Sequence, residues 1–150
     1  MRINKELREY VSRNIIDLTS SSRKLGDVYR LMFRDNNLNI AETEENYRVR
    51  KYSFAEIRSY IEKAADELYS AIGASHGFVA LEMENCVEWI EIFWSILASG
   101  FRPLLMNTRI DEPSLEKLLE SVSAKAVITS GKEFNACPSY SYAEIMDAVK

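Results

Sequence analysis

Hydrophobic positions along this chain follow two spacings, and the change between them marks the predicted elements. From Ser53 to Ile72 they recur every three or four residues, which predicts one long amphipathic helix. Ser53 followed by Glu56 is typical of a capping box at the start of such a helix, and Gly73 supplies a left-handed stop at its end. Short, uninterrupted apolar runs follow, which is the pattern of strands buried on both faces of a parallel sheet.

These apolar runs alternate with further helical segments. The predicted strands are residues 78–81, 104–106 and 126–128. Residues of the kind that cap helices mark the predicted helix starts, at Asn85, Asp111 and Ser141. Strands that alternate with helices favour a largely parallel sheet with right-handed crossovers and helices on both faces.

The region before Ser53 shows other patterns. Helical spacing over residues 5–14 and 25–34 predicts two helices, separated by the polar residues Ser20–Ser22. Alternating stretches at 38–41 and 47–52 flank a charged turn at 42–46 and predict a β-hairpin. The hairpin is expected to add an antiparallel edge to the sheet or to form a small ribbon of its own.

The length favours a single α/β domain over residues 1–150. Its expected parts are a helical lead-in over 1–36, the hairpin over 37–52 and alternating helices and strands over 53–150.

Charge and composition exclude several classes of partner. The net charge of −4 gives no basic surface for nucleic acid. Residues 1–16 lack the continuous apolar core of a signal peptide, and the most apolar run, 89–101, is too short to span a bilayer. The spacing of Cys86 and Cys137 fits neither a zinc site nor a disulfide framework. Together these features favour a cytoplasmic protein without a transmembrane segment.

Single residues give little evidence for a catalytic site. His76, the only histidine, has no metal-ligating neighbours in sequence and is expected in a loop or on the surface. Cys86 stands at a predicted helix start, but no base is close in sequence, so a small buried residue is the favoured interpretation. Trp89 and Trp94 are expected to pack in the core rather than to form a ligand shelf.

The segment Thr129–Lys132 has the composition of a short phosphate loop. It lacks a second glycine and the lysine is followed by glutamate, whereas a phosphate loop needs several glycines and a hydroxyl after the lysine. The segment is therefore predicted to be a turn at the end of a strand. Composition and spacing alone indicate an α/β domain with no identifiable catalytic or metal-binding residue.

Several segments, in order, resemble the adenylate-forming (AMP-binding) superfamily, and within it the acyl-CoA synthetases. Residues 51–57 (KYSFAEI) resemble its first core motif, and residues 97–107 (LASGFRPLLMN) its second. Residues 79–89 resemble the strand-to-helix turn that lies between these motifs. Residues 107–110 resemble the NPRL segment of acyl-CoA ligases, and residues 124–129 the strand that follows the next helix.

The resemblance covers about residues 25–131 and includes departures from the family pattern. Pro103 stands two residues before the family's proline position, which Leu105 occupies. Glu84 and Thr108 also replace prolines that are frequent in the family. These changes indicate a divergent member with the order of elements preserved.

The resemblance implies the first subdomain of the N-terminal domain of a longer ATP-dependent ligase. Such enzymes use ATP and Mg²⁺ to convert a carboxylic acid, often a fatty acid, into an acyl-adenylate, and coenzyme A or a carrier protein then accepts the acyl group. The family's catalytic, cofactor-binding and metal-binding residues lie downstream, so none is carried over to this chain. The chain alone is expected to be inactive, to bind no cofactor and to pack against downstream subdomains.

One loop is a candidate for part of the site. Asn107, Thr108 and Arg109 follow a predicted strand end, where α/β sheets place their ligands, and they are expected to form part of a cleft wall.

Alternative interpretations remain open from sequence. The chain can be a stand-alone, non-catalytic interaction module, or part of an adenylation domain that loads a carrier protein. An unrelated flavodoxin-like binding domain is disfavoured, because residues 82–85 after the first strand are acidic and lack glycine.

Overall fold

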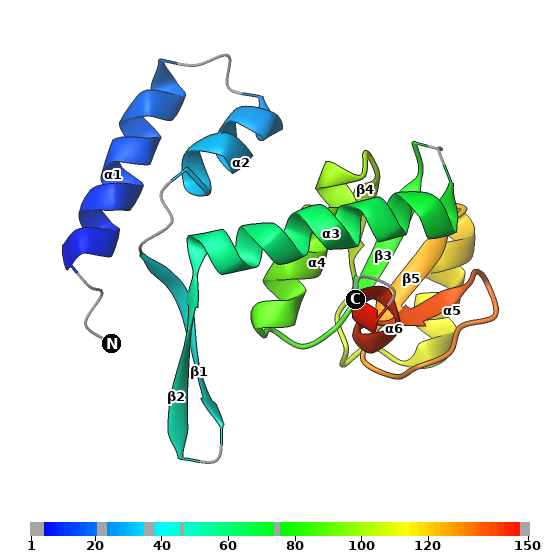
Figure 1. Cartoon of the computed structure of the whole chain (residues 1–150). Coiled ribbons are helices and arrows are strands. Elements are labelled where there is room, and N and C mark those ends of the chain that lie inside the picture. The colour runs from blue at the N-terminus through cyan, green and yellow to red at the C-terminus, as the bar shows by residue number, and fades with distance from the viewer. Residues whose placement is uncertain (1–4, 21–23, 35–37, 46, 74–75, 148–150) are drawn as a thin grey trace. The chain divides into compact units, whose positions relative to one another are not determined.

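The structure is a computed structural model that describes residues 5–20, 24–34, 38–45, 47–73 and 76–147 (Figure 1). The chain divides into two units, Met1–Ser59 (unit 1) and Tyr60–Lys150 (unit 2). The expectation of a single domain over residues 1–150 stays a prediction. A bilayer-crossing helix is absent from the described residues, since none of their helices combines the length and apolar character that a membrane span requires.

Unit 1 opens with two helices, α1 (Lys5–Thr19) and α2 (Leu25–Met32). The α1 helix runs past its predicted end at Asn14 and closes at Thr19, whose hydroxyl donates to the Ile16 carbonyl at 2.6 Å. Between the helices, Ser21 and Ser22 of the predicted polar break lie outside the described residues. The Tyr10 hydroxyl donates to the Leu31 carbonyl at 3.1 Å and so joins α1 to the end of α2.

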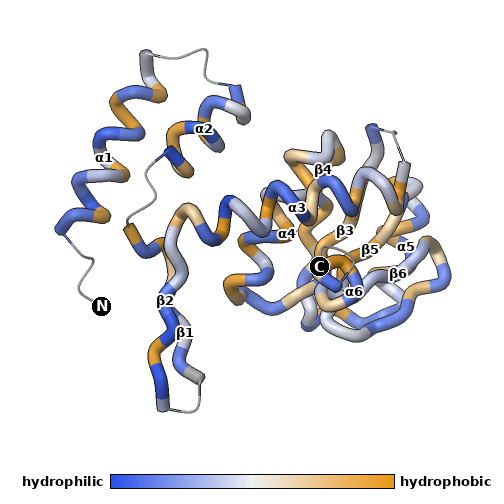
Figure 2. Tube along the Cα trace, viewed as in Figure 1, coloured by the Kyte–Doolittle hydropathy of each residue, from blue (hydrophilic) through white to orange (hydrophobic). Residues whose placement is uncertain are grey.

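The predicted hairpin is present as a separate antiparallel ribbon of β1 (Asn39–Glu45) and β2 (Arg48–Ser53). The predicted turn at 42–46 is wrong, because Glu42–Glu45 belong to β1. These acidic residues lie opposite the basic residues of β2, and Glu42 pairs with Lys51 at 3.4 Å. Because opposite charges on neighbouring strands attract, this pairing stabilises a strand at a position where the acidic residues had indicated a turn. The ribbon is mostly hydrophilic (Figure 2), and Asn46 lies outside the described residues.

The long helix α3 (Phe54–Ile72) begins in unit 1 and continues in unit 2. Its start matches half of the predicted capping box: the Glu56 amide donates to the Ser53 hydroxyl at 3.1 Å. The Glu56 carboxylate instead contacts Arg50 at 3.4 Å. The predicted stop is confirmed, since Gly73 adopts a φ of 88° that favours glycine.

Unit 2 contains a parallel four-stranded sheet in the order β4-β3-β5-β6. Its strands are β3 (Phe78–Glu82), β4 (Arg102–Leu105), β5 (Ala126–Thr129) and β6 (Ser139–Ser141). The strands predicted around residues 78, 104 and 126 are confirmed, with β4 starting and ending earlier than expected. The β6 strand was not predicted, because its short serine-tyrosine-serine sequence has no apolar run.

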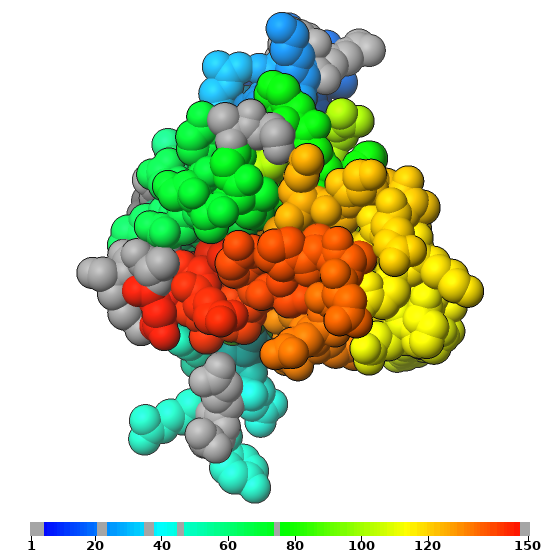
Figure 3. Space-filling view, turned by 90° about the vertical axis from the view of Figure 1, so that its right-hand side faces the viewer, coloured from blue at the N-terminus to red at the C-terminus, as the bar shows by residue number. Residues whose placement is uncertain are grey.

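Helices cover both faces of this sheet, as predicted. They are α4 (Val87–Ala98), α5 (Glu112–Ser121) and α6 (Tyr142–Asp147). Alternation along β3 separates two cores: Val79 and Leu81 pack with α3, α4 and α6, whereas Ala80 packs with α5. Figure 3 shows α5 in yellow, the segment after β5 in orange and α6 in red next to one another. The predicted α/β class, a parallel sheet with a helical segment and a hairpin before it, is confirmed.

Local caps explain where the helices of unit 2 begin. Asp111 caps α5 as predicted, accepting a hydrogen bond from the Ser114 amide at 3.0 Å. The predicted cap at Ser141 of α6 is confirmed and forms a full capping box: the Glu144 amide donates to Ser141 Oγ at 3.2 Å, and the Ser141 amide donates to Glu144 Oε2 at 2.6 Å. The prediction that Asn85 caps α4 is wrong: Cys86 occupies the N-cap position with extended backbone and no side-chain hydrogen bond.

The position of Pro103 in β4 follows from the strand register. Arg102 donates its amide to the Gly77 carbonyl at 2.9 Å, and Met106 donates to the Leu81 carbonyl at 3.0 Å. In a parallel pair, alternate residues turn their amides to the same neighbour, so the amide position of Pro103 points away from β3. The departure from the family pattern therefore removes no hydrogen bond from the sheet.

Candidate functional site

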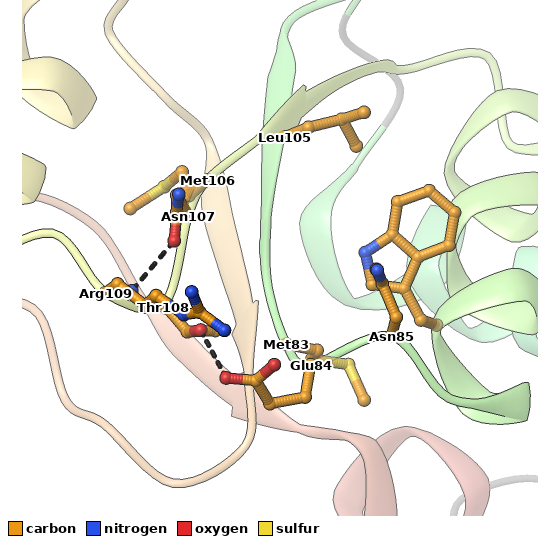
Figure 4. Close-up of a pocket in the computed structure, with 9 residues that line it drawn as sticks. Met83, Glu84, Asn85, Leu105, Met106, Asn107, Thr108 and Arg109 are labelled. Atoms are coloured by element: carbon orange, nitrogen blue, oxygen red, sulfur yellow. Dashed lines mark hydrogen bonds between the residues drawn. The ribbon is translucent and has the colours of Figure 1, made fainter.

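A pocket of about 410 Å³ opens at the carboxyl ends of β3 and β4. The segments that follow the two strands supply its lining, together with Trp89 from α4: Met83, Glu84, Asn85, Trp89, Leu105, Met106, Asn107, Thr108 and Arg109. In Figure 4, Asn107, Thr108 and Arg109 lie on one side, and Met83, Glu84 and Asn85 on the other. Open α/β sheets bind ligands at this edge, because the crossover loops converge there.

Hydrogen bonds within the loop and across the pocket fix the segment that follows β4. The Asn107 side-chain oxygen accepts from the Arg109 amide at 2.9 Å, and the Asn107 carbonyl accepts from the Ile110 amide at 3.1 Å. Across the pocket, the Thr108 hydroxyl donates to the Glu84 carboxylate at 2.5 Å (Figure 4). The three residues expected on a cleft wall thus form one side of the pocket, although their role in an active-site cleft stays a prediction.

The pocket combines free polar groups with an apolar lining. Among the described residues, the Arg109 guanidinium and the Asn85 amide make no hydrogen bond or ion pair, so both remain available to a ligand. Met83 and Met106 are buried beside them, and the Trp89 ring is held by stacking on Phe93 at a centroid distance of 5.3 Å. This arrangement suits a ligand with an apolar body and a group that accepts hydrogen bonds.

A buried ionic network lies at the same edge of the sheet. The Glu82 side chain is 0% exposed at the end of β3, and its two oxygens accept from Thr129 Oγ1 at 2.8 Å and Lys132 Nζ at 2.6 Å. The same ammonium group donates to the Thr108 carbonyl at 3.2 Å. Sequence reasoning missed the pairing of Glu82 with Lys132. One signal in the sequence could have indicated a buried ion pair: a carboxylate, Glu82, ends an otherwise apolar strand.

The segment Thr129–Lys132 is a turn at a strand end, as predicted. The amides of Gly131 and Lys132 donate to Thr129 Oγ1 at 3.4 and 3.1 Å. These amides are therefore already paired, and the turn does not fit a phosphate group. The described residues also contain no group of three or more side chains placed to hold a metal ion. That this chain alone binds neither ATP nor Mg²⁺ stays a prediction.

The remaining candidates have structural roles. His76 is exposed, with Nδ1 lying 3.4 Å from the Gly100 carbonyl, which confirms a surface position. The prediction that Cys86 is buried is wrong: it is exposed, because it precedes α4 at the N-cap position. Partial shielding of the thiol and the neighbouring Glu88 raise the pKa of Cys86, which disfavours a reactive thiolate. Trp94 is buried as predicted, whereas Trp89 both packs against the core and lines the pocket.

Solved structures with the same fold come from adenylate-forming enzymes. The N-terminal subdomain of Klebsiella oxytoca NpsA, in complex with 3-hydroxybenzoyl-AMSN, aligns with a TM-score of 0.69 and 16% identity over 83% of this chain and 30% of that one. The Bacillus subtilis o-succinylbenzoate coenzyme A synthetase MenE, in complex with AMP, aligns with a TM-score of 0.68 and 18% identity over 79% of this chain and 32% of that one. An artificial adenylation–PCP fusion, NpsA–ThdA from K. oxytoca, aligns with a TM-score of 0.67 and 16% identity over 83% of this chain and 23% of that one.

These neighbours are similar in fold, and this chain spans less than a third of their length. No curated protein matches the sequence significantly. A family model described as "AMP-binding enzyme" matches residues 36–149, which include the hairpin, the parallel sheet and the pocket. The chain therefore belongs to the AMP-binding enzyme family.

Proposed function

We propose that this chain is the N-terminal part of an ATP-dependent acid–thiol ligase. The complete enzyme converts a carboxylic acid, a fatty or other acyl acid, into an acyl-adenylate and transfers the acyl group to coenzyme A. The family match over residues 36–149 is the observation that carries this proposal. The parallel sheet with its helices agrees with it, since solved adenylate-forming enzymes share this fold.

Within that enzyme, the described residues act as scaffold and as one wall of the cleft. Asn107, Thr108 and Arg109 form the wall, because they lie at the carboxyl edge of the sheet and leave the Arg109 guanidinium available. ATP, Mg²⁺ and the catalytic residues belong to the remainder of the polypeptide, which packs against this part. A cytoplasmic location completes the proposal.

A carrier protein is the second candidate for the acyl acceptor. The solved neighbours include MenE, named as a coenzyme A synthetase, and NpsA–ThdA, named as a fused adenylation–PCP di-domain. The fold is common to both, so it supports adenylate formation more strongly than either acceptor. A non-catalytic interaction module is the candidate from a different class.

The proposal is tested by ATP–pyrophosphate exchange. The natural polypeptide, expressed at the full length of its coding sequence, is assayed with Mg-ATP and a panel of aliphatic and aromatic carboxylic acids. We expect acid-dependent exchange with at least one class of acid, and thioester formation when coenzyme A is added. Exchange without thioester formation points to a carrier-protein acceptor. An absence of exchange with every acid contradicts the ligase and favours the interaction module.

The 150-residue chain alone is expected to bind Mg-ATP too weakly for detection by isothermal titration calorimetry. The reason is that the Thr129–Lys132 turn already uses its amides internally and the described residues form no metal site. Binding in the micromolar range, retained after a Lys132→Met change, would show a nucleotide site that the described residues do not account for.

A further inference from the structure

We propose that Glu82 and Lys132 form a positioning pair that holds the loop 107–110 at the pocket. Neither residue lines the pocket, and neither has a role in the function proposed above. The pair joins three segments that meet at one edge of the sheet: the end of β3, the turn after β5 and the loop after β4. The importance of the loop for catalysis rests on the proposed function, whereas the geometry of the loop does not.

The Lys132 ammonium is placed to connect these segments. It donates to Glu82 Oε1 at 2.6 Å and to the Thr108 carbonyl at 3.2 Å. Its own backbone is fixed by the bond from the Lys132 amide to Thr129 Oγ1 at 3.1 Å. That same hydroxyl donates to Glu82 Oε2 at 2.8 Å, so both carboxylate oxygens are satisfied. The position of the ammonium group is therefore fixed by Glu82 and by the turn, independently of its contact with the loop.

Thr108 is fixed at two points as a result. Lys132 holds its carbonyl and Glu84 holds its hydroxyl, at 3.2 and 2.5 Å. Of the residues on either side of Thr108, Arg109 carries the free guanidinium of the pocket wall, and Asn107 accepts the hydrogen bond from the Arg109 amide that closes the loop. Loss of the ammonium removes one of the two restraints, so Asn107 and Arg109 are expected to sample more orientations.

Stability alone is a poor explanation for this pair. The Glu82 side chain is 0% exposed and that of Lys132 is 39% exposed, so burying the carboxylate carries a desolvation cost. Well-packed apolar residues at such a position are often equally stable, whereas removing only one partner strands a buried charge. Single and double substitutions therefore separate the two roles. If the pair positions the loop, the loop loses its restraint in both variants, whereas the stability lost in the single variant is recovered in the double variant. If the pair is a stability element, the double variant stays as destabilised as the single one.

The test uses the whole 150-residue chain and three variants: Lys132→Met, the double change Glu82→Met with Lys132→Met, and Lys117→Met as a control. Lys117 is an exposed lysine of α5 that does not line the pocket. NMR measures water exchange of the Arg109 and Ile110 amides, and thermal unfolding is recorded in parallel. We expect exchange about tenfold faster in the single and double variants, the factor that corresponds to losing one charge-assisted hydrogen bond. We expect the double variant to unfold within about 4 °C of the unmodified chain.

Two results overturn the proposal. Exchange within about twofold of the unmodified chain in the double variant means that the pair does not hold the loop. A double variant destabilised as strongly as Lys132→Met means that the pair is a stability element. Faster exchange in the double variant, combined with unchanged pyrophosphate exchange and thioester formation by the full-length polypeptide, supports the positioning pair. That combination of results refutes only the role of the loop in the proposed function.

Discussion

Replacing Leu81 with alanine is expected to lower the free energy of unfolding of unit 2 by about 3 kcal/mol. Leu81 lies on the inner strand β3, between Leu105 of β4 and Ile128 of β5, and its side chain is 0% exposed. Its removal leaves a cavity between the sheet and the helices α3 and α4, which a close-packed core fills only in part.

Urea unfolding followed by tryptophan fluorescence measures this change. Trp89 and Trp94 are the only tryptophans of the chain, and both lie in unit 2, so the signal reports on this unit. Leu105→Ala is the matched control: the side chain is 54% exposed on the edge strand, and we expect a loss of about 0.5 kcal/mol or less. Equal losses in the two variants would contradict the assignment of Leu81 to the core.

The Tyr142→Phe change is expected to lower the free energy of unfolding by about 2 kcal/mol at neutral pH. The Tyr142 hydroxyl donates at 2.5 Å to the Glu91 carboxylate, which is only 2% exposed. Phenylalanine keeps the ring but removes a donor from a buried charge, so part of the desolvation cost of the carboxylate is no longer offset. Tyr140→Phe is the control, because its hydroxyl has no partner among the described residues.

Because of the same contact, the free energy of unfolding of unit 2 is expected to decrease at high pH. Burial and the hydrogen bond to Glu91 raise the pKa of Tyr142 above its ordinary value of 10.0. The folded chain therefore keeps the phenolic proton at a pH where the unfolded chain loses it, so the stabilisation is complete below pH 10.0 and declines above it. In urea titrations from pH 8 to 11, the difference in free energy of unfolding between the unmodified chain and Tyr142→Phe is expected to decrease as the pH rises. A constant or increasing difference would refute this assignment.

Periodicity was sufficient to predict most of unit 2. The run at residues 78–81 and the capping residues Asp111 and Ser141 depend on local rules, because an apolar strand and a hydrogen-bonded cap are decided by near neighbours in sequence. The parallel arrangement followed from alternation of strands and helices. The position of the loop 107–110 at the carboxyl edge followed from the same alternation.

The features that were missed depend on pairing partners that the local sequence pattern does not identify. Glu82 and Lys132 meet across 50 positions of sequence, and no local pattern links them. The acidic residues of β1 indicated a turn until their basic partners on β2 were known. The β6 strand, Ser139–Ser141, forms because β5 offers it a free edge, which a short polar sequence does not reveal. Cross-strand pairing decided the hairpin and β6, and a tertiary contact decided the ion pair.

The outward-facing Pro103 has a consequence for self-association. Among the described residues β4 pairs only with β3, so its other side presents the backbone of an edge strand. Such an edge is a template for strand addition by a second molecule, which leads to aggregation. Because proline lacks an amide hydrogen, one donor is missing from the middle of this four-residue strand, and a continuous ladder with an incoming strand is interrupted. Pro103 therefore acts as a gatekeeper against intermolecular β-sheet growth.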